Sequence, residues 1–189
     1  EICACLVGSE MCIRDSLNEG FETTSTDQYS PNFPDGWSTV DSYTGNNDRY
    51  RWNIYYYEKG TMTGTHCASV DSPMFTGSED GGEGPREEIL LTPELNLDNT
   101  YQLSFDWMAA SKAAIDEGKY DFQVRIVTDG NVEGAETIWS FNNATQLKEN
   151  GNVPYPWTAW TIYKTMIDLS KWQGKNIKLS LIHISEPTR

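Results

Sequence analysis

Residues 101–107, Tyr101-Gln102-Leu103-Ser104-Phe105-Asp106-Trp107, alternate apolar and polar side chains with a period of two. This alternation predicts a β-strand with one face against a core, because successive side chains of a strand point to opposite faces. Residues 120–127 alternate in the same way, and shorter β-prone runs occur at 17–22, 37–41, 51–57, 68–70, 137–141 and 157–167. Helix-length periodic runs are few, so the chain is expected to be all-β.

The inward-facing residues of these strands are expected to form one core between two sheets. They are Phe21, Trp37, Leu90, Leu103, Phe105, Phe122, Val124, Trp160 and Ile162. Turn-forming stretches at 30–36 and 168–175 separate the strands. Roughly nine or ten strands with long connections predict a jelly-roll β-sandwich of two antiparallel sheets.

The two ends of the chain are interpreted as foreign to the rest of it. Residues 7–15 and 179–188 can be encoded by the two opposite strands of one DNA segment, which resembles a transposon adapter used for sequencing libraries. Residues 1–16 and 179–189 are therefore interpreted as translated adapter, and 17–178 as a domain cut from a longer gene. Residues 1–16 are expected to pack poorly. Residues 176–184 are expected to stand in for a missing last strand, with an imperfect fit because Leu181-Ile182 breaks the alternation.

The charge and composition of the chain exclude several classes of binding partner. Asp and Glu number 28 against 14 Lys and Arg, which gives a formal net charge of −14. Such acidity disfavours nucleic acid, whose phosphates require clustered Lys and Arg, and it disfavours an anionic membrane surface. The sequence has no apolar run of transmembrane length, so no membrane insertion is expected. With the two ends set aside, Cys67 and His66 are the only Cys and His, which leaves no disulfide framework or Cys-metal cluster.

Four short stretches, taken in their order along the chain, carry a family resemblance. They are Glu-Gly-Phe-Glu at 19–22, Phe-Pro-Asp-Gly-Trp at 33–37 followed by Asp41, residues 88–97 followed by Leu-Ser-Phe at 103–105, and Trp160 followed by Asp-Leu-Ser at 168–170 and Gly-Lys at 174–175. This order resembles the cleaved-adhesin family, also called choice-of-anchor J domains, which are jelly-roll modules of gingipain-type adhesins and many surface proteins of Bacteroidota. The resemblance covers nearly all of 17–178. It implies an extracellular or cell-surface location and other domains of a larger surface protein as partners.

Calcium is the metal that the sequence favours, because calcium takes oxygen ligands from carboxylates, amides and backbone carbonyls. The candidate ligands are Glu22, Asp41, Asn46, Asn47, Asp48, Asp106 and Asp168. The resemblance implies the same ion, since family members hold structural calcium, although the loop at 44–48 carries fewer carboxylates than the family pattern. The competing interpretation is that Asn and Asp in loops cap turns.

Glycan binding requires exposed aromatic rings that stack on sugar faces. The candidates are Tyr55, Tyr56, Tyr57, Trp139, Tyr155 and Trp157. Alternation turns at least one side chain of the three consecutive tyrosines outward. The competing interpretation for each ring is packing in the core or between strands.

Catalysis finds little support in the sequence. His66 and Cys67 are adjacent, and on a strand their side chains would point apart, so they could not share a proton. The chain has no nucleophile elbow, phosphate-binding loop or His-Glu-x-x-His motif, and no spacing singles out a pair among its many acids. The sequence therefore predicts a non-catalytic binding or adhesion module for a glycan or a host surface protein. The alternative is an accessory domain of a secreted peptidase or glycoside hydrolase.

Overall fold

The computed structural model describes residues 2–6, 17–43, 48–59, 64–71, 86–109, 120–140 and 160–185, and for residues 2–6, 120 and 185 it describes the backbone only. The strands are β1 (Ile2–Leu6), β2 (Tyr29–Ser30), β3 (Ser38–Val40), β4 (Asn53–Tyr56), β5 (His66–Val70), β6 (Arg86–Leu91), β7 (Leu95–Asn96), β8 (Gln102–Ala109), β9 (Tyr120–Thr128), β10 (Glu136–Ser140), β11 (Tyr163–Asp168) and β12 (Asn176–Ser185). Two short 3-10 helices, η1 (Asp48–Tyr50) and η3 (Ser170–Trp172), join them. In this described part, no helix has the length and apolar character needed to cross a membrane.

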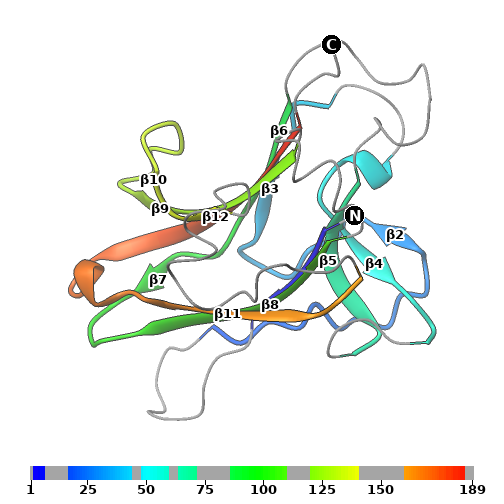
Figure 1. Cartoon of the computed structure of the whole chain (residues 1–189), viewed down its shortest axis with the longest axis horizontal. Helices are drawn as coiled ribbons and strands as arrows, with labels where there is room; N and C mark the ends of the chain where they lie inside the picture. The colour runs from blue at the N-terminus through cyan, green and yellow to red at the C-terminus, as the bar shows by residue number, and fades with distance from the viewer. Residues whose placement is uncertain are drawn as a thin grey trace.

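The strands form two antiparallel sheets that pack face to face (Figure 1). Sheet A has the order β11-β8-β1-β5-β4-β2, and sheet B has the order β10-β9-β12-β6-β3, with β7 also pairing with β12. All of these pairings are antiparallel. The all-β sandwich expected from the alternating strands is therefore confirmed.

An aromatic cluster fills the space between the sheets. Phe105 of sheet A meets Trp139 of sheet B edge to face, with ring centroids 5.5 Å apart, and meets Phe122 at 6.4 Å. Such edge-to-face pairs add to the stabilisation that burial of the rings provides. Seven of the predicted core residues are buried as expected: Phe21, Trp37, Leu90, Leu103, Phe105, Phe122 and Val124.

Trp160 and Ile162 were predicted to be buried, and this prediction is wrong. Their exposed fractions are 61% and 48%. β11 begins only at Tyr163, and its buried residues are Tyr163 and Thr165, so the inward face has the opposite phase to the predicted one. Trp160 lies in a turn ahead of the strand with a φ of 60°, and its N–H donates to the Ala109 carbonyl at 2.9 Å.

The expected strand at 17–22 is also wrong, although its core residue is correct. The segment contains an isolated bridge residue at Glu19 and no strand. Phe21 has a φ of 59°, a conformation that non-glycine residues seldom adopt. Its ring nevertheless lies in the core, 4.9 Å from the Trp37 ring centroid.

Both ends of the chain supply strands. Residues 176–185 form β12 between β9 and β6, which confirms the expected last strand. Both faces of β12 are covered, while Ser180 Oγ is buried without a hydrogen-bond partner among the described residues. Leu181 packs in the main core, while Ile182 packs in a second cluster with Ile89, Leu91 and Val127.

The expectation that residues 1–16 pack poorly is wrong for residues 2–6. β1 pairs with β8 on one side and with β5 on the other, so it joins the two halves of sheet A. The sequence predicts one vacant strand position, whereas the sandwich has a second one between β5 and β8. An apolar run such as Ile-Cys-Ala-Cys-Leu suits this central position, where both edges of the strand are paired. Residues 7–16 lie outside the described part.

Candidate functional site

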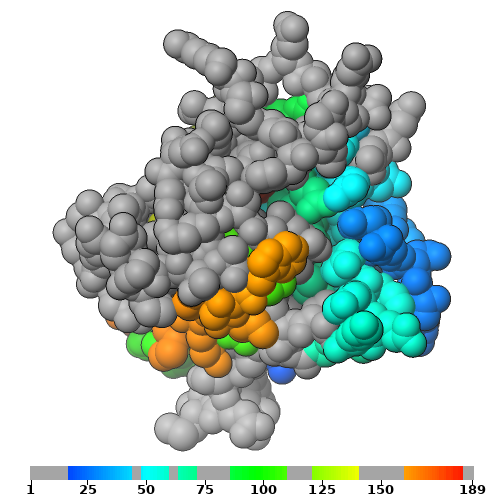
Figure 2. Space-filling model, turned by 45° about the vertical axis from the view of Figure 1, so that its right-hand side comes forward, coloured from blue at the N-terminus to red at the C-terminus, as the bar shows by residue number. Residues whose placement is uncertain are grey.

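Three tyrosines lie on the outer face of sheet A, at its β2–β4 edge, and we call Tyr29, Tyr55 and Tyr57 the tyrosine row. Trp52 and Ile54 belong to the core, so the alternate residues Tyr55 and Tyr57 face outward. Tyr29 is the Cα partner of Tyr55, and their ring centroids are 5.5 Å apart. The rings of Tyr55 and Tyr57 are 6.4 Å apart and nearly parallel, at 20°. Figure 2 shows the β2 segment, in blue, beside the β4 segment, in cyan, at the surface.

A fixed charge pair lies beside the tyrosine row. The Arg49 guanidinium carbon is 5.9 Å from the Tyr29 ring centroid. Asp71 Oδ2 accepts hydrogen bonds from two nitrogens of Arg49, at 2.8 Å and 2.6 Å. The hydrogen bond to Asp71 raises the pKa of Arg49, so the guanidinium remains charged. Aromatic faces next to fixed polar groups can hold a ring that is apolar on one face and polar at its edge.

The other aromatic candidates do not join the row. Trp139 is 2% exposed and packs in the core against Phe105, so its prediction as a ligand-binding residue is wrong. Its position in β10 turns the ring toward sheet A, where burial of a large ring stabilises the fold. Tyr56 faces the opposite way from Tyr55 and Tyr57. Tyr155 and Trp157 lie outside the described residues.

The buried His66 and the half-exposed Glu22 form a hydrogen-bonded group, and Tyr56 packs against the His66 ring. His66 Nε2 is 2.8 Å from the Ser25 carbonyl oxygen, and Nδ1 is 3.1 Å from Glu22 Oε2. Glu22 Oε1 also accepts the backbone N–H groups of Thr65 at 3.0 Å and His66 at 3.2 Å. Burial works to raise the pKa of Glu22, but the hydrogen bonds from His66 and Thr65 outweigh it and lower that pKa. The Glu22 carboxylate therefore holds β5 to the segment ahead of β2.

Cys67 lies on the other side of β5 from His66. Ala68 and Val70 belong to the core cluster, and His66 shares their phase, whereas Cys67 is out of phase with them. Cys67 is fully buried and forms no disulfide. The arrangement agrees with the expectation that His66 and Cys67 point apart.

Two of the calcium candidates meet at an acidic corner, which comprises Asp41, Asp48, Arg51, Ser42 and Glu88. Asp41 and Asp48 both lie next to the guanidinium of Arg51, at 3.8 Å and 3.1 Å. Glu88, on β6, accepts a hydrogen bond from Ser42 Oγ at 3.0 Å. Burial, together with the negative charge of Asp41, raises the pKa of Glu88 to about 7, although the hydrogen bond from Ser42 opposes this rise.

Glu88 was missed by the sequence analysis. Its side chain is 2% exposed, and its Oε2 accepts no hydrogen bond from the described residues. When protonated, Glu88 can donate that proton to the neighbouring Asp41 carboxylate. The sequence does indicate this buried carboxylate. Glu88 precedes the predicted core residue Leu90 by two positions, and on a strand it therefore shares the inward face of Leu90.

The remaining calcium candidates are elsewhere. Asp106 lies on β8 opposite Lys164, and Asp168 accepts the Ser170 N–H at 2.8 Å, a backbone hydrogen bond that lowers the pKa of Asp168. Asn46 and Asn47 lie outside the described residues. Among the residues that the structure describes, no three His, Cys, Asp or Glu side chains gather closely enough to hold a metal ion.

Comparisons of the chain with protein-family models, with curated proteins and with solved structures found no match. The tyrosine row and the acidic corner are the two candidate sites among the residues that the structure describes.

Proposed function

We propose that this chain is a non-catalytic binding or adhesion module of the cell surface or extracellular space, and that it holds a glycan at the tyrosine row. The observation that carries the proposal is the nearly parallel pair of Tyr55 and Tyr57 rings, which face outward next to Tyr29. The resemblance of the sequence to cleaved-adhesin domains supports the same class of function.

The charges beside the row favour a neutral glycan. The chain has a formal net charge of −14, which repels polyanions such as sulfated glycans at a distance. Arg49 is already neutralised by Asp71, so the pair offers donors and acceptors to sugar hydroxyls without a net charge. The apolar face of a neutral sugar would then stack on Tyr55 and Tyr57, while its hydroxyls meet the Arg49–Asp71 edge.

The test is a glycan array probed with the full chain, followed by titration of any neutral glycan that binds. Tyr57→Ala is expected to weaken binding by up to about tenfold, since a stacked ring contributes about 0.5–1.5 kcal/mol. Tyr57→Phe keeps the ring face and should retain most of the binding. Val40→Ala, which removes an exposed apolar side chain of sheet B, is the control and should bind like the wild type. Binding that survives Tyr57→Ala and Tyr55→Ala, or binding only to a host protein at another face, would contradict the proposal.

The second part of the proposal places calcium at the acidic corner. Glu88 is buried beside the negative charge of Asp41, which together with burial raises the pKa of Glu88, and a cation bound there would neutralise the two carboxylates. The expected result is a rise in melting temperature on addition of calcium, reversed by a chelator, because an ion that binds only the folded state stabilises it. Asp41→Asn should abolish the rise. The matched variant Asp98→Asn, at an exposed acid elsewhere, should leave it unchanged.

A further inference from the structure

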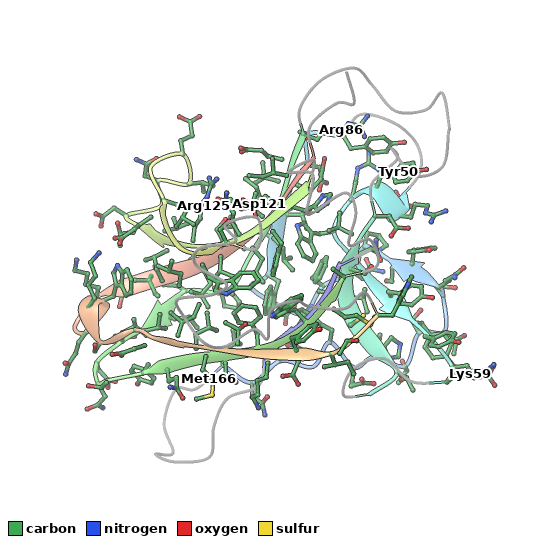
Figure 3. All side chains as sticks on the ribbon, in the orientation of Figure 1. Tyr50, Lys59, Arg86, Asp121, Arg125 and Met166 are labelled. Carbon is green, nitrogen blue, oxygen red and sulfur yellow. The ribbon has the colours of Figure 1, made fainter. Side chains whose placement is uncertain are left out.

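The outer face of sheet B carries two cations, Arg125 on β9 and Lys178 on β12. Arg125 is in phase with Val127, and Lys178 is in phase with Ile182. Both of these apolar residues lie in the second cluster, outside the main core. Figure 3 shows Arg125 on the side of β9 that faces away from sheet A. Both cations are half-buried, and none of the ion pairs between the described residues includes either of them.

A chain of hydrogen bonds fixes the orientation of Arg125. Its Nε donates to Gln123 Oε1 at 2.8 Å, and the same oxygen accepts a hydrogen bond from Thr137 Oγ1 at 3.3 Å. Gln123 Nε2 in turn donates to Asp121 Oδ2 at 2.6 Å. The two Nη groups of Arg125 make no hydrogen bond with the described residues, and their fork matches the two oxygens of a carboxylate. The relay therefore holds a guanidinium ready for an anion.

Ser180 adds a buried hydroxyl next to both cations. It is the Cα partner of Arg125 and follows Lys178 by two positions, so it shares their outer face. Arg125 and Lys178 are then diagonal neighbours, at a Cα separation of about 7–8 Å, which is within reach of one small anion. Ser180 is fully buried, and its Oγ has no hydrogen-bond partner among the described residues. A buried hydroxyl in this state lowers stability unless a bound group accepts its proton.

We propose that Arg125, Lys178 and Ser180 form an anion-binding site that takes the carboxylate of an acidic sugar. A single negative charge suits the site, because the net charge of −14 opposes each further negative charge and so disfavours a phosphate dianion. The exposed Thr137, which is the Cα partner of Arg125 on β10, can accept a hydrogen bond from a ring hydroxyl, and this favours a sugar over the end of a peptide. The site uses no residue of the tyrosine row or the acidic corner, so its failure would leave both earlier proposals untouched.

The test is titration of the full chain with sodium glucuronate at constant ionic strength, with glucose as the uncharged comparison. Both sugars are titrated into the wild type and into Tyr57→Ala, in which stacking at the tyrosine row is weakened. Glucuronate is expected to bind more tightly than glucose in both proteins and to raise the melting temperature, because an anion that binds only the folded state stabilises it. Equal binding of the two sugars would show that the carboxylate is not recognised and would overturn the proposal.

Variants of the three residues locate the site. Arg125→Gln should weaken glucuronate binding at least about tenfold, because it removes charged hydrogen bonds to the carboxylate. Lys178→Gln should weaken it by about two- to fivefold, as expected for a partly solvated cation. Ser180→Ala should weaken binding slightly and raise the melting temperature of the free protein, because it removes an unpaired buried hydroxyl. Lys59→Gln, the same charge change at an exposed position elsewhere, is the control.

Two further probes separate the sugar from other anions. Inorganic phosphate and N-acetylalanine are titrated in the same way, and both are expected to bind more weakly than glucuronate. Phosphate or N-acetylalanine binding as tightly as glucuronate would overturn the choice of an acidic sugar. If Arg125→Gln does not fold, Arg125→Lys keeps the charge but loses the fork, and it should still weaken binding. Glucuronate binding that survives the Arg125 and Lys178 variants would place the anion elsewhere and overturn the proposal.

Discussion

The core aromatic cluster and the tyrosine row are built from the same kind of side chain but have opposite roles. Phe105 and Trp139 have ring centroids 5.5 Å apart, and Tyr29 and Tyr55 have the same separation. The first pair lies between the sheets, where burial of the rings contributes to stability. The second pair lies on the outer face of sheet A, where the rings remain partly exposed. The phase of a residue on its strand, rather than its type, thus decides whether an aromatic ring stabilises the fold or is available to a ligand.

The largest effect expected from this comparison is loss of folding when residues 179–189 are deleted. The deletion removes most of β12, and with it Leu179, Leu181 and Ile182, which are each at most 2% exposed. Each buried side chain of this kind contributes about 1.5–3 kcal/mol, and the whole domain is expected to have a stability of only about 5–15 kcal/mol. Circular dichroism should show no cooperative thermal transition. A chain that still unfolds cooperatively would mean that the sandwich closes without β12.

Phe105→Ala tests the core side of the comparison directly. Removal of a fully buried phenylalanine ring is expected to lower the free energy of unfolding by about 3–5 kcal/mol. Urea denaturation measures the loss. Tyr57→Ala is the matched variant on the outer face, and its effect should stay below about 1 kcal/mol because Tyr57 is 44% exposed. Equal losses at the two positions would remove the distinction between the two groups of rings.

The same contrast explains what could be predicted from the sequence. β8 and β9 have regular alternation, and their inward residues were predicted correctly, since a period of two fixes the phase. The long run at 157–167 has apolar residues in both phases, so its inward face was assigned incorrectly. The tyrosine row was recognised only through Tyr55 and Tyr57. Tyr29 joins it by a pairing between β2 and β4 that local sequence does not specify.

The acidic corner and β1 show the same limit of prediction from local sequence. Glu88 meets Asp41 because β3 pairs with β6, a contact between segments far apart in the chain. The position of β1 between β5 and β8 depends on the order of strands in sheet A, which alternation does not determine. Phase is a local property of a strand, whereas neighbours across a sheet are set by the topology of the whole domain.

His183 provides a test of the core at acidic pH. Burial lowers the pKa of His183 to about 3, below the ordinary value of 6.5, so the folded state binds this proton less readily than the unfolded state. Its contribution to stability is therefore complete above pH 6.5 and is lost as the pH falls toward 3. At pH 5, which is about 1.5 units below the pKa of the unfolded state, the loss in the free energy of unfolding is about 2 kcal/mol.

The measurement is urea denaturation of the wild type and His183→Gln between pH 4 and pH 8. The pKa of Glu88, raised to about 7, gives the opposite slope, so the difference between the two proteins is compared rather than the wild-type curve alone. The difference should shift in favour of the variant as the pH falls below 6.5. A difference independent of pH would show that His183 is not buried in its neutral form.

A smaller loss of stability than that of Phe105→Ala is expected for His66→Ala, which should lower stability without changing binding, the reverse of Tyr57→Ala. His66 holds the Ser25 carbonyl and the Glu22 carboxylate, so its removal should lower the free energy of unfolding by about 1–3 kcal/mol. Binding of a neutral glycan should not change, because His66 faces the core side of β5 while Tyr55 and Tyr57 face outward. Titration calorimetry at a temperature well below the transition measures binding, and urea denaturation measures the free energy of unfolding. A large loss of binding with unchanged stability would show instead that His66 takes part in chemistry or recognition, and that the outer face alone does not define the site.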